Sequence, residues 1–472
     1  MTPRDQLVCA KGKGVIQTYW LTIQEKSPDR ESDKSEEGSS VVSNEDPLPV
    51  DLPRIPTITR SEGDSRFDDK TCRMIDWNIE VLHRQLQKVF ATRDLKSKKP
   101  PSNDASKLRT KSQREGCTVL DEVKDVIPLS TKSSAYKRDP NKTQLSPEVV
   151  AQLREYVEAI ASMYRDNEFH SFEHASHVLQ SVTKLLAHVV TADSTDFQQL
   201  GYKKKMDTAF DEYTHAITSD PIVQFACVFA ALIHDVDHPG VQNAILVEED
   251  ADVAKVYKGK SVAEQQSVDL AWELLMEPTY DDLRACIYQT QEELDRFRQL
   301  IVNAVMATDI ADKELGEIRK KRWERAFRSD TSPASNEELV TEDRNRKATI
   351  VIEHLIQASD VAHTMQHWQV YLKWNERLFH EMYQAYQNGR SATNPADFWY
   401  EGEIQFFDKY VIPLAKKLSE CGAFGVASAE YLNYASANRE EWVNQGKQVI
   451  RGYMKRYGWF LPGLKTFASP AI

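Results

Sequence analysis

The sequence predicts an all-α protein with a compact multi-helix domain over residues 118–468, and three observations support this. From about Thr118 onward, apolar residues recur at three- and four-residue steps, which is the spacing of one helix face. Proline and glycine interrupt this region only rarely. No stretch alternates apolar and polar residues as a half-buried strand would, and no internal repeat is visible.

Composition limits the class of protein. The chain has 472 residues, of which 41% are hydrophobic, which is enough for a sizeable core. A net charge of -12 argues against a nucleic-acid partner, because no Lys/Arg stripe offsets the repulsion from phosphates. Six cysteines are scattered without a C-x-x-C pair, which indicates a reducing compartment. They are Cys9, Cys72, Cys117, Cys227, Cys286 and Cys421.

No segment has the features of a membrane anchor or a secretion signal. The longest apolar run, residues 225–233, is far too short to cross a bilayer. The N-terminus lacks the apolar core of a signal peptide. We therefore expect a cytoplasmic protein with no membrane span in this chain.

Residues 25–117 are expected to be a disordered linker that contains one amphipathic helix. Residues 26–70 are rich in Ser, Asp, Glu and Pro and offer too little apolar surface to offset chain entropy. A helix at about 73–91 is predicted by apolar residues on one face. They are Met74, Ile75, Ile79, Leu82, Leu86 and Val89. This helix could dock on a partner surface or form a short dimeric coiled coil.

Several helix ends in the main domain can be predicted from their residues. Ser146-Pro147-Glu148 provides an N-cap serine, a proline in the first turn and an acid at the positive end of the helix dipole. Asp220-Pro221 caps a helix at 222–233 that is apolar nearly all round and is therefore expected to be buried. Residues 328–347 are polar and are expected to form a surface loop.

Two histidine clusters supply candidate metal ligands. His170, His174 and His177 have the i, i+4, i+7 spacing of one helix face. The second cluster is His234-Asp235, followed by His238, at the end of the buried helix. Imidazole suits zinc, and carboxylate can bridge to a harder ion, so this mixture fits a site for two divalent cations.

A buried carboxylate is predicted at Asp360, which lies within an otherwise apolar helical stretch. An unpaired buried carboxylate is costly, so Asp360 should have a cationic partner. That partner could be an arginine or a metal ion. The metal is favoured because the other hard ligands also lack a charge partner.

These motifs resemble the catalytic domain of class I 3′,5′-cyclic nucleotide phosphodiesterases. The resemblance rests on the helix that begins at His170, on the His234-Asp235-x-x-His238-x-Gly240 segment, and on Asp360 in a Ser-Asp helix. It runs from about Ser146 to Leu464. It implies a compact all-α, HD-type domain that hydrolyses a cyclic nucleotide (cAMP, cGMP or both) to the 5′-monophosphate and so ends a signal.

The resemblance also implies roles for individual residues. The zinc ligands would be His174, His234, Asp235 and Asp360. Asp235 would also bridge to a second ion, magnesium or manganese. His170 would protonate the leaving O3′, and His238 would lie near the metal-bound waters. Glu264 would hold waters of the second ion. The substrate would contact His170, Asp235, Asp360, His363, Glu403 and Phe406, with Phe406 as an aromatic clamp on the purine.

Four positions depart from the family pattern. Ser171 replaces an asparagine, and His177 replaces a frequent aspartate. His363 stands where an asparagine that contacts the purine is frequent. Glu403 aligns with the glutamine that binds the purine, and a carboxylate only accepts hydrogen bonds, so the usual rule for base recognition is in doubt.

Residues 1–24 resemble the C-terminal hairpin of a class III nucleotide cyclase. A Lys11-Gly12-Lys13-Gly14 turn precedes a Thr18-Tyr19-Trp20-Leu21 strand. The resemblance implies that the chain derives from a fused cyclase–phosphodiesterase whose parent is tethered at a membrane. No cyclase activity is implied, because nothing else of a cyclase is present.

Two rival functions remain. One is an HD-type nucleotide phosphohydrolase, which uses the same His, His-Asp and Asp metal ligands. The other is a helical scaffold with a degenerate, inactive site. The spacing to Glu403 and Phe406 and the large helical domain favour the phosphodiesterase over the phosphohydrolase. The presence of all four candidate ligands together with His170 argues against the scaffold.

Overall fold

A computed structural model describes residues 67–93, 117–129, 136–191, 215, 217–327, 337–424 and 427–459, and the short strands near the N-terminus. The chain divides into two units, Met1–Thr59 and Arg60–Ile472. In the first unit, β2 (Val8–Ala10) pairs antiparallel with β3 (Gly14–Ile16), and β1 (Thr2–Pro3) pairs antiparallel with β4 (Tyr19–Trp20). The predicted turn residues 11–13 lie outside the described residues. The resemblance to a cyclase remains a prediction.

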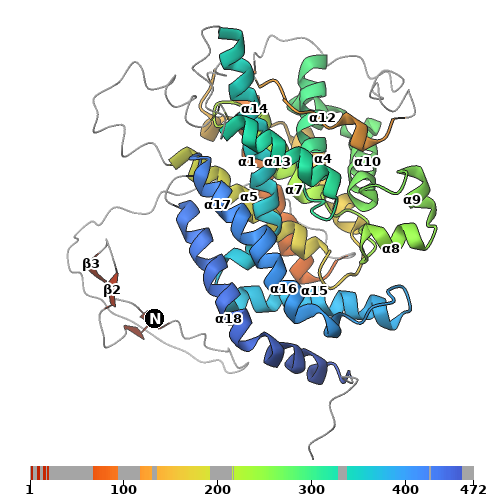
Figure 1. Cartoon of the computed structure of the whole chain (residues 1–472). Coiled ribbons are helices and arrows are strands. Elements are labelled where there is room, and N and C mark those ends of the chain that lie inside the picture. Colours follow the sequence, from red (N-terminus) through yellow and green to blue (C-terminus); the bar gives the residue numbers. More distant parts are fainter. Residues whose placement is uncertain are drawn as a thin grey trace, which may run out of the picture. The chain divides into compact units, whose positions relative to one another are not determined.

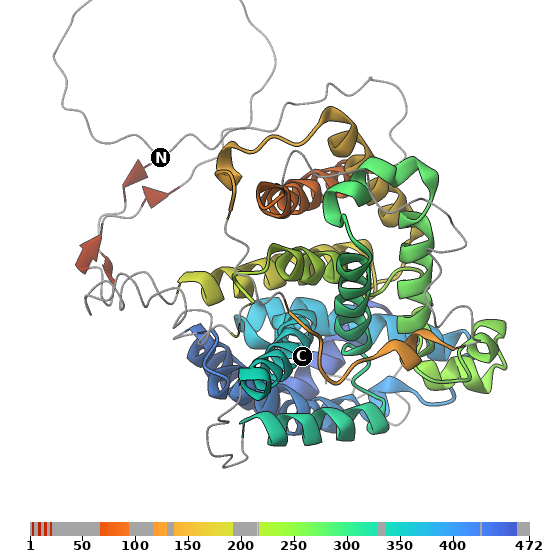
Figure 2. The same cartoon turned by 90° about the horizontal axis from the view of Figure 1, so that it is seen from above.

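The described elements of the second unit are all helical, which confirms the predicted fold class (Figures 1 and 2). Its longer helices are α1 (Asp69–Ala91), α4 (Pro147–Met163), α5 (Phe172–Thr191), α7 (Pro221–Ile233), α10 (Val262–Leu275), α12 (Gln291–Met306), α13 (Lys313–Phe327), α14 (Glu337–Asp360), α15 (Trp368–Gln387) and α18 (Ala427–Arg456). Shorter helices are α8 (Asn243–Glu248), α9 (Asp252–Val256), α11 (Asp281–Ile287), α16 (Trp399–Phe406) and α17 (Ile412–Glu420). Single turns are η1 (Val119–Glu122), η2 (Pro140–Lys142), η4 (Pro278–Tyr280), η5 (Ala362–Met365), η6 (Pro395–Asp397) and the π-helical η7 (Phe407–Val411).

Helix α7 is the centre of the N-terminal half of this unit. Every residue of α7 is buried, and α1, α5, α12 and α14 pack against it. Its start agrees with the prediction, because the Asp220 side chain accepts a hydrogen bond from the Ile222 amide at 3.1 Å. Helix α4 also begins as predicted, with the Ser146 hydroxyl accepting from the Val149 amide at 3.3 Å. In the C-terminal half, α15, α16 and α17 pack on α18.

Helix α1 is part of the helical unit. The prediction that it belongs to a linker outside a domain beginning at residue 118 is therefore corrected. Its apolar face packs on α4, α5 and α7. Leu82, Leu86 and Val89 are fully buried there. The sequence showed that one face of this helix is apolar, but it did not show which surface covers that face. The remaining residues of the predicted linker, 25–66 and 94–116, lie outside the described residues.

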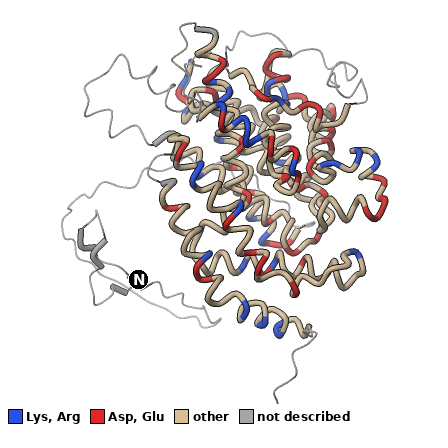
Figure 3. The backbone as a smooth tube through the Cα atoms, in the orientation of Figure 1, with Lys and Arg blue, Asp and Glu red and all other residues tan. Residues whose placement is uncertain are grey.

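A second correction concerns residues 337–347, which begin α14 instead of forming a surface loop. Ion pairs at i, i+4 spacing support this polar helix start. Arg346 lies 2.5 Å from Glu342, and Lys347 lies 2.8 Å from Asp343. Acidic and basic residues are interspersed along the helices of this unit (Figure 3), which is consistent with the absence of a long basic stripe in the sequence. Among the described residues, no helix combines the length and apolarity needed to cross a membrane.

Candidate metal and catalytic site

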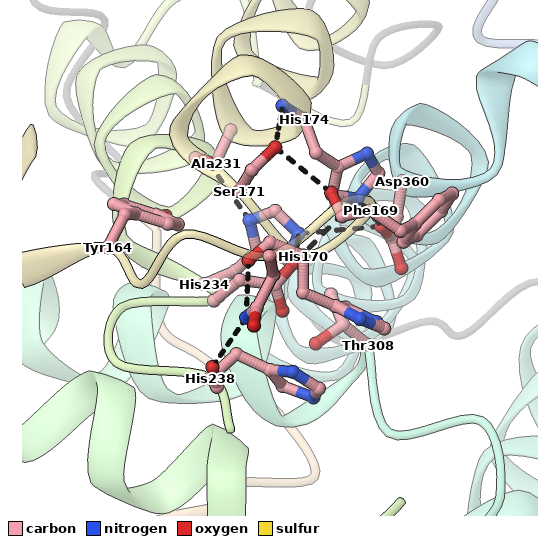
Figure 4. A network of polar contacts seen from close by, with 12 residues as sticks. Tyr164, Phe169, His170, Ser171, His174, Ala231, His234, His238, Thr308 and Asp360 are labelled. Atoms are coloured by element: carbon pink, nitrogen blue, oxygen red, sulfur yellow. Dashed lines mark hydrogen bonds and ion pairs between the residues drawn. The ribbon is translucent and has the colours of Figure 1, made fainter. Parts of the chain in front are cut away.

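Three helix ends bring the four predicted metal ligands together, and Figure 4 labels three of them, His174, His234 and Asp360. His174 lies in the first turn of α5, and Asp360 is the last residue of α14. His234 and Asp235 lie in the turn directly after α7. Because α5, α7 and α14 pack against one another, these ends meet.

The ligand atoms have the spacing expected around one divalent ion. The Nε2 atom of His174 lies 2.9 Å from Oδ1 of Asp360 and 3.7 Å from Oδ2 of Asp235. The Nε2 atom of His234 lies 3.2 Å from Oδ2 of Asp235 and 3.4 Å from Oδ1 of Asp360. Ligand bonds of about 2.1 Å in a tetrahedron place neighbouring ligand atoms roughly 3.4 Å apart. The donor set therefore fits zinc.

Hydrogen bonding leaves the metal-facing atoms available. Nδ1 of His234 donates to the Ala231 carbonyl at 3.0 Å, which leaves the Nε2 lone pair for a metal. His234 Nε2 and Asp235 Oδ2 are buried, and neither has a hydrogen-bond partner among the residues that the structure describes. Such atoms are costly to bury without a ligand.

Charge also prepares this cluster for a cation. Burial alone would raise the pKa of Asp235, but His234 outweighs burial and holds it well below the usual range. The pKa of Asp360 is also lowered, because the adjacent imidazoles of His174 and His234 outweigh its burial. Both carboxylates are therefore ionised at neutral pH and can bind a cation.

His170 does not lie on the helix of the other histidines, which corrects the predicted i, i+4, i+7 face. Helix α5 begins at Phe172, so His170 lies near the end of the loop between α4 and α5. Its ring centroid lies 6.3 Å from that of His174. This loop position directs the ring differently from the metal ligands, as a proton donor near the metal would require.

Glu381 on α15 holds His170. Its Oε1 lies 2.5 Å from Nδ1 of His170, and its Oε2 accepts from the amides of Phe169 and His170 at 2.8 and 3.1 Å. Burial lowers the pKa of His170, but Glu381, with smaller contributions from Asp235 and Asp360, outweighs burial and raises this pKa to about 9. His170 is therefore protonated at neutral pH.

The ring of His238 stacks on that of His170, with centroids 3.8 Å apart and planes inclined by 23°. Burial and the charge on His170 lower the pKa of His238 to about 3, so His238 is neutral. Its Nδ1 accepts from the Gly240 amide at 3.2 Å, so the proton resides on Nε2. A charged and a neutral imidazole thus lie face to face.

Glu264 belongs to a separate acidic pair with Asp309. It accepts from the Asn243 amide at 2.9 Å, and that amide also lies 3.5 Å from Asp309. Burial and the negative charge of Asp309 raise the pKa of Glu264 to about 8. A bound cation would offset this repulsion, so these residues are suited to the surroundings of a second ion.

The three residues expected to contact the base lie on η5 and α16. His363 is buried, with its ring 5.7 Å from that of Phe169, which in turn lies 4.5 Å from that of His174. Phe406 is half-buried and stacks on Tyr410 at 5.5 Å.

Glu403 is buried and accepts a hydrogen bond from the Tyr371 hydroxyl at 2.6 Å. Asn375 donates to the same hydroxyl at 3.3 Å. Burial raises the pKa of Glu403 to about 7. This carboxyl group can therefore change its protonation state near neutral pH.

His177 is not part of the ligand cluster. Its ring lies 5.2 Å from Trp374, and burial lowers its pKa to about 4. Sequence reasoning missed Glu381, Asn243, Asp309 and Tyr371. Each is a single polar residue without a spacing motif, and only its contacts in the fold mark it out.

Comparison with known proteins identifies the family. The family model described as 3′5′-cyclic nucleotide phosphodiesterase matches residues 169–424. In Caenorhabditis elegans, "Probable 3′,5′-cyclic-AMP phosphodiesterase pde-4" is 28% identical over 46% of this chain, and "Probable 3′,5′-cyclic phosphodiesterase pde-3" is 25% identical over 61%. Human "cGMP-inhibited 3′,5′-cyclic phosphodiesterase 3A" is 26% identical over 50%. The matched segments make up 28%, 42% and 21% of these relatives.

A solved structure is also similar. The phosphodiesterase domain of Salpingoeca rosetta rhodopsin phosphodiesterase matches 65% of this chain and 83% of its own, with 22% identity and a TM-score of 0.48. The family model alone spans more than half of the 472 residues and includes His170 and all four predicted metal ligands. The chain therefore belongs to the 3′,5′-cyclic nucleotide phosphodiesterase family.

Proposed function

We propose that the chain hydrolyses the 3′ ester bond of a 3′,5′-cyclic nucleotide to give the 5′-monophosphate, in a reaction that depends on divalent cations. The observation that carries this proposal is the His170–Glu381 pair beside the four-ligand cluster. A proton donor adjacent to a cation site is what cleavage of a phosphodiester with a poor alkoxide leaving group requires.

His170 is proposed as the catalytic acid. Its Nδ1 is engaged by Glu381 at 2.5 Å, so Nε2 is the nitrogen free to give a proton to the leaving O3′. Glu381 stabilises the imidazolium and fixes the orientation of the ring. His238 is neutral and lies against this ring, so it can hold a water molecule by its Nε2–H without competing for the proton.

Two divalent cations are proposed, zinc and either magnesium or manganese. His174, His234, Asp235 and Asp360 would hold the zinc, and Asp235 would also face the second ion. Glu264 would bind waters of that ion. When bound, the cations would supply a water nucleophile at neutral pH and offset negative charge on the phosphoryl oxygens.

We propose that the base lies among His363, Glu403 and Phe406, with Phe406 against the purine face. Cyclic AMP and cyclic GMP both remain candidate substrates. The reaction is proposed to occur in the cytosol and to end a cyclic nucleotide signal. Dimerisation through α1 is not part of this proposal, because helices of the same chain cover its apolar face.

A linear nucleotide substrate is the main rival, because HD-type phosphohydrolases use the same set of ligands. The pairing of His170 with Glu381 favours a cyclic diester, whose O3′ leaves as a ribose alkoxide and needs a proton. A catalytically inactive scaffold is disfavoured, because such a protein has no use for two histidines and two carboxylates that are gathered with the spacing of a cation site.

The test is a comparison of substrates with the metal-loaded protein. Turnover of cyclic AMP, cyclic GMP, a nucleoside 5′-monophosphate and a nucleoside triphosphate would be measured together with the zinc content. We expect turnover of at least one cyclic nucleotide and none of the linear ones. Turnover restricted to linear nucleotides would favour the phosphohydrolase, and a zinc-free, inactive protein would favour the scaffold.

A further inference from the structure

Asn167 connects the backbones of His170 and His238. It lies in the loop between α4 and α5 and is partly buried. Its side-chain amide donates to the His170 carbonyl at 3.0 Å and to the His238 carbonyl at 2.7 Å. A single NH2 group therefore links the peptide of the proposed proton donor to the peptide of the residue that stacks on it.

Two other links join the same pair of loops, but neither reaches His170. The Asp237 amide donates to the Met163 carbonyl at 3.2 Å. The Arg165 guanidinium lies 2.6 Å from the Asp237 carboxylate, and this ion pair is largely exposed. An exposed pair of this kind contributes little to stability. Of these three links, only the one made by Asn167 contacts the backbone of both His170 and His238.

Gly240 shows how closely Asn167 fits this turn. It has a positive φ of +69°, and a Cβ atom placed on it would lie 2.9 Å from Oδ1 of Asn167. The Gly240 amide in turn donates to Nδ1 of His238. Asn167 therefore packs against the same peptide that sets the protonated nitrogen of the His238 ring.

From this geometry we propose that Asn167 is a positioning residue for catalysis, which keeps the His170 ring in stacking register with His238 and aimed at the leaving oxygen. The proposal rests on the assignment of His170 as the proton donor in the proposed function. Asn167 itself touches neither substrate nor metal in this role, and it acts through two backbone carbonyls.

The energetic basis is the sensitivity of proton transfer to geometry. Glu381 holds the His170 ring at Nδ1 and the amides of Phe169 and His170, but none of these contacts joins this loop to His238. Asn167 provides that connection through the two carbonyls. A displacement of about 1 Å at a reacting group can reduce the rate on the order of 100-fold.

The decisive variant is Asn167→Asp, because it keeps the shape and removes the donor. Its carboxylate would face two carbonyl oxygens that need a hydrogen bond, so the two segments should separate. We expect kcat for the cyclic nucleotide to fall on the order of 10- to 100-fold with little change in KM. Asn167→Ala should lose a similar amount. If the residue only filled space, the isosteric Asp variant would keep the activity of the wild type.

A second substrate separates positioning of the acid from general damage. Bis(p-nitrophenyl) phosphate has a leaving group that needs no proton. The loss in Asn167→Asp should therefore be much smaller with this substrate. Equal losses with both substrates, at unchanged zinc content, would overturn the proposal.

The matched control is Arg165→Met, which removes a different link between the same loops. It should keep the kcat of the wild type and the same ratio between the two substrates. If this variant matched Asn167→Asp in both respects, loop attachment in general would explain the effect and the specific role of Asn167 would be refuted.

An NMR measurement distinguishes failure of this proposal from failure of the proposed function. The ring protons of His170 and His238 report their stacking through ring-current shifts and require no turnover. We expect both sets of shifts to change in Asn167→Asp and to stay unchanged in Arg165→Met. Unchanged shifts in Asn167→Asp would overturn the positioning role, whether or not the wild type hydrolyses cyclic nucleotides. If the wild type does not hydrolyse cyclic nucleotides but Asn167→Asp still shows these shift changes, only the proposed function is refuted.

Discussion

His170 and Glu381 form a hydrogen-bonded pair, with Nδ1 and Oε1 2.5 Å apart, although 211 residues separate them in the chain. Glu381 is buried and also accepts from two backbone amides, so it is held as an ionised carboxylate with a pKa of about 2. Burial opposes this shift, and the charge on His170 outweighs burial. The pair keeps the proposed acid charged within a buried site.

The first prediction concerns Glu381→Gln and pH. The carboxylate raises the pKa of His170 from 6.5 to about 9, so the acid is protonated below that value and lost above it. Removing the charge should move the alkaline limb of the kcat profile to lower pH and reduce kcat at pH 8 roughly 10- to 100-fold. The measurement is kcat from pH 6 to 10.

Glu376→Gln is the matched control, because Glu376 lies on the same helix and pairs with Arg456 at 2.8 Å. It should leave the pH profile unchanged. An alkaline limb that stays in place in Glu381→Gln would show that this carboxylate does not set the protonation of the acid.

The second prediction concerns metal retention. His234→Ala and Asp360→Ala each remove an atom that directly faces the cation position, so zinc and activity should be lost together. The affinity should fall by more than the roughly 10- to 100-fold typical for loss of an outer hydrogen bond. Elemental analysis of the purified variants provides the measurement.

Two further variants serve as controls for the loss of zinc. His177→Ala alters the same helix as His174 but lies outside the cluster, so it should retain zinc. His170→Ala should retain zinc and lose turnover. Full zinc occupancy in either ligand variant would remove that residue from the site.

Local patterns account for what the sequence predicted correctly. The buried helix α7 follows from a run of apolar residues behind an Asp-Pro cap. The clustering of His234 and Asp235 follows from their place at its end, and their role as ligands stays a prediction. Asp360 was identified because a carboxylate in an apolar helix requires a partner. Each inference needed only residues within about one helix of each other.

The features that could not be predicted from the sequence depend on contacts between residues far apart in the chain. Glu381 is one polar residue on an amphipathic helix, and no spacing relates it to His170. The apolar stripe of α1 predicts burial but not the surface that buries it. His170 was assigned to the helix because i, i+4 spacing alone does not show that α5 begins at Phe172.

The third prediction concerns α1. Leu82 and Leu86 are fully buried against the helical unit, so truncation of either to Ala should reduce the free energy of unfolding by about 2–5 kcal/mol. Arg84→Ala is the control, since Arg84 is exposed and pairs with Glu80 on the same helix. Its effect should stay within about 0.5 kcal/mol. Urea unfolding measures all three, and equal stability of the Leu variants and the control would show that α1 is not part of the core.

The last prediction concerns base choice at Glu403. Tyr371 and Asn375 on α15 and Tyr453 on α18 face this carboxyl group, and burial raises its pKa to about 7. Below that pH it is protonated and can both donate and accept, like glutamine. Above that pH it offers only acceptors, which match the N1–H and 2-amino donors of guanine and repel the ring nitrogen of adenine.

The ratio of kcat/KM for cyclic GMP over cyclic AMP should therefore rise between pH 6 and pH 8. In Glu403→Gln the ratio should move towards cyclic AMP and lose this pH dependence. Tyr371→Phe removes a donor that lowers the pKa of Glu403, so the rise should occur at higher pH in that variant. A wild type that prefers cyclic AMP throughout this range, with no change in Glu403→Gln, would show that the carboxyl group does not contact the base.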